Sequence, residues 1–196
     1  ADPVAGETAP SLPPVKPGSK SKNQPAATRQ ELFRITGVDL VAVEGISASL
    51  AQTIISEIGT DMSRFPTARH FCSWLGLAPH HDISGGKVLR SRTLKTDNRA
   101  GQAFRQATAS VTRSDLVFGA FYRRKRAQIG PLQALVATAH KIARTVYFML
   151  KNHVAYHDIG VQGYETQQRE RELTHLQRKA AKLGFELTPK QAAVPS

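Results

Sequence analysis

The sequence predicts a mainly α-helical protein: a small helical domain with a helix-hairpin-helix and a short loop or hairpin insert, followed by a charged helix. Several segments repeat apolar residues every three or four positions, which is the period of an amphipathic helix. Gly, Pro, Asp and Thr lie between these segments, where helix starts and stops are expected. Residues 80–96 have no helical period and are rich in Gly, Ser, Thr and basic residues, which predicts the insert.

The chain begins with a segment of different composition. Residues 1–30 contain six of the eleven prolines and almost no large apolar side chains. Such a segment cannot bury enough apolar surface to offset the entropy lost on folding. We expect residues 1–30 to be a disordered Pro/Ser/Lys-rich linker with a further domain before it. The main domain is expected over 31–160, and a charged helix with a tail over 161–196.

Order is expected to begin near Glu31, and residues 36–59 predict a helix, a tight turn at Gly45 and a second helix that ends at Gly59. A helix-hairpin-helix of this kind directs turn amides and a helix N-terminus at a nucleic-acid phosphate. We therefore expect Gly45 and Ser47 to contact nucleic acid. An ordinary helical turn is the alternative, and Ser47 stands where such hairpins often have a second glycine.

Four further helices are expected before the charged one. A short helix follows Pro66 and Thr67, another runs from a cap at Asp97 to about Arg113, and a third covers 115–129. The clearest amphipathic helix is 132–151, whose apolar stripe consists of Leu132, Leu135, Val136, Ala139, Ile142, Ala143, Val146 and Leu150.

The charged helix is expected over 164–183. Its apolar residues, Leu173, Leu176, Ala180 and Leu183, are spaced three, four and three positions apart. This spacing permits either a coiled-coil seam or a contact with the main domain.

The net charge points to a polyanionic partner. Lys and Arg total 27 against 15 Asp and Glu, giving a formal charge of +12. Such an excess binds phosphates by releasing counterions, although a merely basic soluble protein is the alternative. The densest run, residues 123–126, follows two aromatic residues. We expect Arg123, Arg124 and Arg126 to contact nucleic acid, unless the run is only a solvated helix face.

Other classes of protein are excluded or disfavoured. The single cysteine, Cys72, cannot form an internal disulfide; it fits a reducing compartment and lies in an apolar stretch, so we expect a buried, inert thiol. No apolar run approaches the roughly 18 residues of a membrane span, and no signal peptide is visible. The seven histidines lack ligand spacing and the fifteen acidic residues are scattered, so no metal site is expected in this chain.

The segment HHDISGGKVLRSR, residues 80–92, holds the candidate catalytic residue, Ser84. A serine that attacks a phosphodiester must be exposed on a sharply turned backbone near cations that stabilise the transition state. Gly85 and Gly86 permit such a turn and the close approach of a phosphate. The expected phosphate contacts are Lys87, Arg90, Arg92 and Arg99. From spacing alone, a basic surface loop is the simpler interpretation.

These segments together resemble one family. TGVDL, VEGIS, SEIGTDMSRFPT, SWLGLAP, ISGGKVL, NRA, GAFYRR, ATAHKIAR and KLGFEL occur in an order and spacing similar to the C-terminal half of the IS110/IS116/IS902 insertion-sequence transposases. These are DEDD-type, bridge-RNA-guided serine recombinases. The resemblance extends from about Arg34 to Leu187, which is essentially all of the chain expected to be ordered.

The resemblance implies roles that the residues alone leave open. Ser84 falls on the family's S-G motif, so it would be the nucleophile that forms a covalent phosphoserine link to DNA. The partners would be DNA, a guide RNA and a RuvC-like DEDD domain that holds Mg²⁺, in a homo-oligomer of the full-length protein. Nothing in this chain matches that DEDD site, so no cofactor is expected here. The location implied is the bacterial cytoplasm, at the nucleoid.

The resulting hypothesis is a DNA-binding, serine-bearing transposase domain that recombines DNA only together with the DEDD domain and is inactive alone. The first alternative is a truncated, non-catalytic nucleic-acid-binding relic or repressor, which the lack of a metal site favours. The second is a structural basic protein, which predicts no cleft around Ser84.

Overall fold

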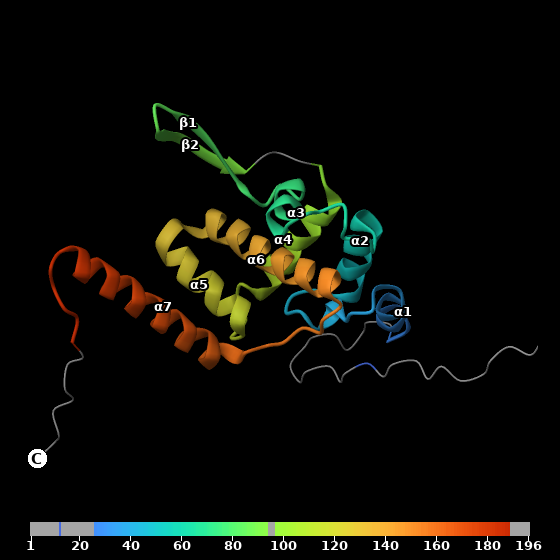
Figure 1. Cartoon of the computed structure of the whole chain (residues 1–196). Coiled ribbons are helices and arrows are strands. Elements are labelled where there is room, and N and C mark those ends of the chain that lie inside the picture. Colours follow the sequence, from blue (N-terminus) through green and yellow to red (C-terminus); the bar gives the residue numbers. More distant parts are fainter. Residues whose placement is uncertain (1–11, 13–25, 94–96, 189–196) are drawn as a thin grey trace, which may run out of the picture. The chain divides into compact units, whose positions relative to one another are not determined.

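The computed structural model describes residue 12, residues 26–93 and residues 97–188, and this described part is mainly helical (Figure 1). The predicted fold class is therefore confirmed. The chain divides into two compact units, Ala1–His157 and Asp158–Ser196. In order, the elements are α1 (Ala26–Thr36), the 3₁₀ helix η1 (Leu40–Ala42), α2 (Ala48–Ile58), α3 (Ala68–Trp74), β1 (Pro79–Ser84), β2 (Lys87–Thr93), α4 (Arg99–Val111), α5 (Val117–Ile129), α6 (Pro131–Asn152) and α7 (Gly160–Lys182).

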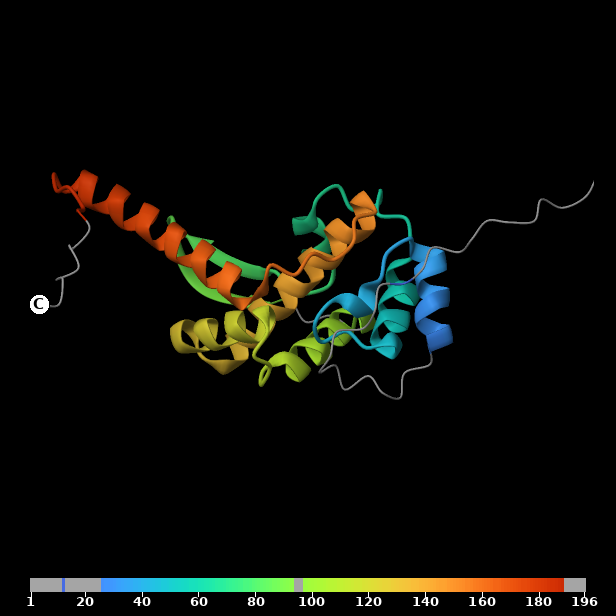
Figure 2. The same ribbon diagram turned by 90° about the horizontal axis from the view of Figure 1, so that it is seen from below.

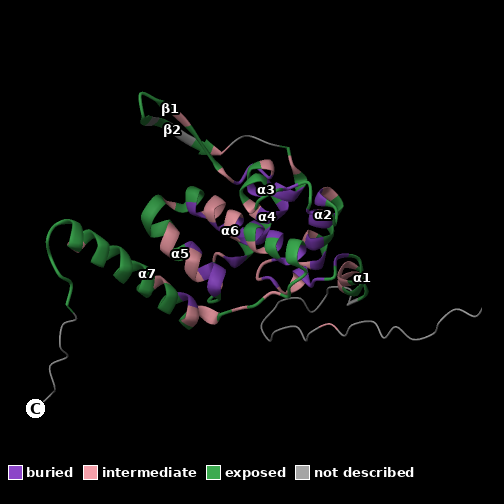
Figure 3. Ribbon diagram, viewed as in Figure 1, coloured by how far each residue is buried: buried purple, intermediate pink, exposed green. Residues whose placement is uncertain are grey.

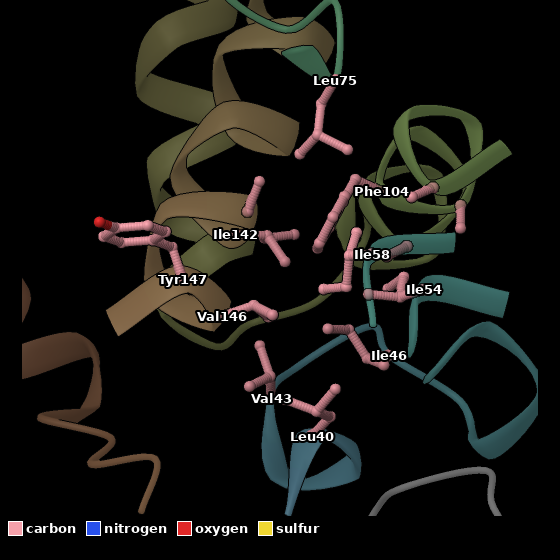
Figure 4. Close-up of a cluster of buried hydrophobic side chains, with 14 of the residues drawn as sticks. Leu40, Val43, Ile46, Ile54, Ile58, Leu75, Phe104, Ile142, Val146 and Tyr147 are labelled. Atoms are coloured by element: carbon pink, nitrogen blue, oxygen red, sulfur yellow. The ribbon is translucent and has the colours of Figure 1, made fainter. Parts of the chain in front are cut away.

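Helix α6 is the centre of the first unit. Helices α3, α4 and α5 pack against α6, and α2 packs against α4. Phe71, Phe104, Ile142 and Tyr147 are among the fully buried side chains, and Figure 4 shows the last three in the core. The aromatic rings meet at angles, with Phe71 edge-on to Phe104 at 6.4 Å between centroids. Such arrangements are favoured by the ring quadrupoles.

The predicted apolar stripe of α6 is largely correct. Its buried members are Ala139, Ile142, Ala143, Val146 and Leu150. Leu132, in contrast, is exposed, and Leu135 and Val136 are only half-buried. These residues lie in the first turns of α6, next to the α5–α6 connection at Gly130, where fewer neighbouring helices can cover the stripe.

Polar side chains fix the starts of several helices by accepting backbone N–H groups. They are Ser47 for α2, Thr67 for α3 and Asn98 for α4. The prediction that Asp97 caps α4 is wrong by one residue, because Asn98 Oδ1 accepts from Gly101 N at 2.9 Å. Both residue types suit this position, so the sequence could not decide between them.

Helix α5 begins after Leu116, which has no side-chain cap of its own. Instead, Glu44 Oε2 accepts the backbone N–H of Phe118 at 2.9 Å, from a turn 74 positions earlier in the chain. A carboxylate at a helix N-terminus is favourable because it accepts an otherwise unpaired N–H and opposes the helix dipole. This contact joins the α2 region to α5.

The predicted helix-hairpin-helix is not confirmed. The element before the Gly45 turn is only the three-residue 3₁₀ helix η1. Asp39 caps it, accepting from Val41 N at 3.1 Å. The helix expected to begin at Thr36 is therefore absent at that place; Thr36 is instead the last residue of α1.

Helix α1 begins earlier than expected, because residues 26–30, assigned to the linker, are helical. The remainder of the predicted linker, residues 1–25, lies outside the described residues except for residue 12. Helix α1 lies beside α2 in both views of the ribbon (Figures 1 and 2). Arg29 anchors it: the guanidinium forms a bidentate ion pair with Asp39, with Nε 3.1 Å from Oδ1. Both side chains are well buried, at 13% and 7% exposure.

The charged helix is longer than expected, starting at Gly160 rather than 164. The leucines of its proposed seam, Leu173, Leu176 and Leu183, are exposed, and most of α7 is exposed in Figure 3. The seam stays a prediction.

Replacing Arg29 with Ala is expected to destabilise the protein by about 3 kcal/mol, because it leaves the buried carboxylate of Asp39 without its cation. Urea denaturation monitored by circular dichroism measures this. Arg34 on the same helix is the matched control: its pair with Glu31 is exposed, so Arg34→Ala should cost no more than about 0.5 kcal/mol. Equal losses for the two variants would contradict the anchoring role of Arg29.

Candidate nucleic-acid interface and serine-bearing hairpin

The insert predicted over 80–96 contains an antiparallel hairpin of strands β1 and β2, which stands away from the helices of its unit in Figure 1. Gly85 and Gly86 form its turn, with φ values of +56° and +76°. Two positive φ angles in a two-residue hairpin loop identify a type I′ geometry, which glycine adopts without strain. An added Cβ would meet no atom within 4 Å at either glycine. The turn therefore needs glycine for its backbone angles, and it leaves open space beside the preceding serine.

Ser84 is the last residue of β1 and lies directly opposite Lys87. Both residues are exposed. Residues opposite one another in an antiparallel pair share a face, and alternate residues of a strand share a face. His80 and Asp82 therefore belong to the face of Ser84, and so does Arg92, the register partner of His80. The register thus places a serine, a carboxylate, an imidazole and three basic residues, Lys87, Arg90 and Arg92, at positions on one side of the hairpin.

The charges on this face are partly balanced. His80 Nε2 lies 3.5 Å from Asp82 Oδ1, and both side chains are exposed. Arg90 occupies the register position opposite Asp82. Among the described residues, no His or carboxylate forms a hydrogen bond with the Ser84 hydroxyl. The hairpin therefore supplies a nucleophile and phosphate-binding cations, whereas it does not assemble an activated nucleophile by itself.

A β-bulge divides the hairpin. The register shifts between Asp82 and Ile83, and Leu89 is the extra residue on β2. Ile83 and Leu89 are large apolar side chains that are 63% and 67% exposed. Bulges increase local twist and re-aim side chains near functional sites.

Arg99, in the first turn of α4, is exposed and separated from β2 by residues 94–96, which lie outside the described ranges. Its Nη1 is 3.4 Å from Glu57 Oε1 of α2. Part of its charge is thus already compensated within the helical body. Any phosphate contact of Arg99 would compete with this ion pair.

The basic run 123–126 lies on α5, so its members point in different directions around the helix. Arg123 Nη1 donates to the carbonyl of Ser114 at 2.6 Å, and Nη2 lies 3.6 Å from Asp115. Arg123 thus braces the α4–α5 connection. Arg124 is half-buried and Arg126 is exposed. The run is therefore not one continuous binding surface, and Arg126 is the exposed arginine that takes no part in this brace.

Gly45 and Ser47 have structural roles in the observed fold. Gly45 has a φ of +88°, and an added Cβ would lie 2.5 Å from Ala107 O and 2.6 Å from Val111 Cγ1. The glycine therefore lets the turn approach α4. Ser47 Oγ accepts from Leu50 N at 3.2 Å as the cap of α2. Contact of either residue with nucleic acid stays a prediction.

Replacing Gly45 with Ala is expected to lower stability by about 2–4 kcal/mol, because the methyl group combines a strained φ with overpacking against α4. Thermal or urea unfolding measures the loss. Gly59 is the matched control: its φ is +71° and no atom lies within 4 Å of an added Cβ, so Gly59→Ala should show only the strain, about 1 kcal/mol. If Gly45→Ala were as stable as Gly59→Ala, close packing would not explain this glycine.

Cys72 is fully buried in α3, which confirms the prediction of an inaccessible thiol. Burial raises the pKa of Cys72 to about 12, and the charge of Arg144 opposes this rise. The thiol therefore stays protonated at neutral pH and is no rival nucleophile to Ser84.

A thiol reagent such as DTNB is expected to leave the folded protein unmodified at pH 8, because the Cys72 thiol is both buried and protonated there. Addition of denaturant should release one equivalent of reaction, in keeping with the single cysteine. Absorbance of the released thiolate measures both states. Rapid reaction of the folded protein would show that α3 opens readily.

The described residues bear on two of the expectations, those of a metal site and of a membrane span. Within residues 12, 26–93 and 97–188, no group of three or more His, Cys, Asp or Glu could hold a metal ion. No helix in this same part of the chain is long and apolar enough to cross a membrane.

A comparison with known protein families finds a match at residues 39–123. The matched segment runs from the cap of η1 to α5 and includes the whole serine-bearing hairpin. The model that matches is described as the Transposase IS116/IS110/IS902 family, and the resemblance seen in the sequence is thereby confirmed for residues 39–123. No protein with a curated description matches the chain.

Sequence reasoning missed two contacts that position this domain, those of Arg29 with Asp39 and of Glu44 with Phe118. The surroundings of Asp82 were likewise not predicted: its carboxylate lies near His80, and the register places it opposite Arg90. Residues two apart in a strand share a face, so a strand here would have placed His80 beside Asp82. The sequence HHDIS has no apolar–polar alternation that would indicate such a strand.

Proposed function

We propose that this chain is the DNA-binding, serine-bearing domain of an insertion-sequence transposase, with Ser84 as its nucleophile. The observation that carries the proposal is the position of Ser84: exposed at the end of β1, beside an open glycine turn and directly opposite Lys87. A hydroxyl in this place can approach a phosphodiester without a steric barrier. The family match at residues 39–123 supports a transposase-related role for the segment that contains it.

The proposed reaction is a pair of phosphoryl transfers. In the first, the Ser84 hydroxyl proton passes to water and an Oγ–P bond forms with a DNA phosphodiester. The bond from phosphorus to the 3′ oxygen breaks, and that oxygen takes a proton to become a free 3′ hydroxyl. In the second, a 3′ hydroxyl of another strand attacks the same phosphorus, the Oγ–P bond breaks, and Ser84 regains its proton.

The hairpin cations stabilise this chemistry electrostatically. Lys87 lies opposite the attacking serine, and Arg92 lies further along the same face. Cations placed where charge develops on the phosphoryl oxygens lower the barrier more than they stabilise the ground state. Arg90 and Arg99 are the other proposed phosphate contacts of this segment.

Further components are proposed to lie outside this chain. Magnesium does not fit the described residues, which contain no cluster of three candidate ligands. We place the ion in a separate RuvC-like DEDD domain, with which this chain acts in an oligomer on DNA and a guide RNA. The lack of an activating base at Ser84 supports the proposal that this chain is inactive alone.

A non-catalytic nucleic-acid-binding relic or repressor is the second candidate. The same observation, a serine without an assembled base or metal, favours it. The two candidates differ in one measurable property, the formation of a covalent protein–DNA species.

Covalent trapping tests the proposal. Labelled donor DNA, a family guide RNA, Mg²⁺ and a RuvC-like DEDD domain are mixed with this chain, and linked species are separated on denaturing gels. We expect a linked band that needs the added domain and is lost in Ser84→Ala, because the attacking oxygen is removed. The matched control is Ser73→Ala, which removes an exposed hydroxyl from α3 and should leave the band unchanged.

Two results would count against Ser84. A band that persists in Ser84→Ala would assign the nucleophile elsewhere. Salt-sensitive DNA binding without a band under any condition would support the relic, with Ser84 serving only the turn.

A further inference from the structure

The segment 116–157 has an unusual charge distribution. It contains seven Lys and Arg residues and no Asp or Glu, and it covers α5 and α6. A solvated helix face ordinarily mixes both signs, so that neighbouring charges compensate one another. The basic run 123–126 accounts for four of the seven. The other three, Lys141, Arg144 and Lys151, lie on α6 and have no role in the proposed hairpin chemistry.

These three residues share one side of α6. Lys141, Arg144, Phe148 and Lys151 recur at spacings of three, four and three, so they follow one another along the helix surface; we refer to them as the α6 stripe. Arg144 and Lys151 are exposed, Phe148 is 41% exposed and Lys141 is half-buried. The stripe lies about half a turn around α6 from the buried residues Ala139, Ile142 and Val146, and therefore on the side away from the core.

Aromatic rings hold the cations in place. Lys141 Nζ lies 4.4 Å from the ring centroid of Phe121, and Arg144 Cζ lies 5.6 Å from that of Phe148. Lys151 Nζ donates to the Tyr147 hydroxyl at 2.7 Å and to the Pro66 carbonyl at 3.0 Å.

Cation–π contacts and hydrogen bonds restrain long side chains before any partner binds. Less side-chain entropy is then lost on binding, which favours a preformed anion-binding surface.

We infer that the α6 stripe binds the phosphate backbone of duplex DNA, as a second contact separate from the serine-bearing hairpin. This inference rests on the proposed function, because it assumes a nucleic-acid partner. Lys141 and Lys151 are ten residues apart, so the stripe spans about 15 Å. That length faces about four phosphates of one DNA strand.

Backbone contact suits the stripe better than base stacking. Tyr147 is buried, and the rings of Phe121 and Phe148 already lie under cations. Single-strand binding proteins instead present open aromatic faces to successive bases. The stripe holds positive charges at fixed positions, and such charges bind the phosphate backbone without distinguishing the base sequence.

The test is the salt dependence of DNA binding, measured by fluorescence anisotropy with a labelled duplex. Arg144→Gln should reduce the slope of log K against log salt by about 1, because one phosphate contact is lost. The reduction should be similar for unrelated DNA sequences. Arg144→Lys keeps the charge and should retain most of the slope. The matched control is Arg113→Gln, which removes an exposed arginine beyond the end of α4 and should leave the slope unchanged.

A second variant covers the case in which Arg144→Gln unfolds, which a thermal melt would show. Ala137 is half-buried and lies one turn before Lys141 on α6. Ala137→Glu places a carboxylate there, where a Glu–Lys pair at this spacing stabilises a helix. It leaves every cation of the stripe in place. We expect it to weaken duplex binding by repelling phosphates while the melting temperature is maintained.

The outcomes separate this inference from the proposed function. If Arg144→Gln and Ala137→Glu bind duplex DNA like the unmodified chain, the inference is wrong, whereas trapping through Ser84 can still succeed. An equal loss for Arg113→Gln would also overturn it, since the effect would then be one of net charge. A loss confined to duplex RNA of the same sequence would assign the stripe to RNA instead. If the unmodified chain binds no nucleic acid at all, the proposed function fails with it.

Discussion

The burial of one face of α6 is the interaction on which the rest of the structure depends. Ile142, Val146 and Tyr147 are covered where α3, α4 and α5 pack on this helix. Burial of each large apolar side chain contributes roughly 1.5–3 kcal/mol. The chain leaves α3 to enter β1, and it returns from β2 toward α4. The hairpin is therefore connected at its two ends to α3 and α4, which both pack on α6. The packing of this core thus determines the position of the serine-bearing segment.

Helical periodicity predicted α6 because its buried face must repeat every three or four residues, as Ala139, Ile142 and Val146 do. Helical periodicity gave a wrong prediction before Gly45, where a polar contact determines the structure instead. Asp39 caps η1 and pairs with Arg29. Local patterns do not record this choice, because Arg29 lies ten positions away in a segment whose composition indicates a linker. Glu44 illustrates the same limit, since its partner is 74 positions distant.

The candidate site was predictable in its residue types and less so in its arrangement. Ser84 before two glycines indicated a sharp turn, and the structure places it at the tip of a hairpin. Which cations accompany it depends on strand register, which sequence spacing alone does not give. The same holds for the basic run, where Arg123 donates to the carbonyl of Ser114. A cation that stabilises the fold and one that faces a partner look alike in a sequence, and only packing distinguishes them.

The bulge at Leu89 has a consequence for the chemistry of the hairpin. If strand pairing continued from Ser84 and Lys87 without an extra residue on β2, Asp82 would lie opposite Leu89 and His80 opposite Ser91. The unpaired Leu89 shifts the phase of β2 by one, so that Arg90 and Arg92 take those positions. Because the side-chain period of a strand is two, a shift of one exchanges the two faces. Because Leu89 is unpaired, Arg90 and Arg92 hold the two β2 register positions on the side of the serine. Without the bulge, Leu89 and Ser91 would hold them.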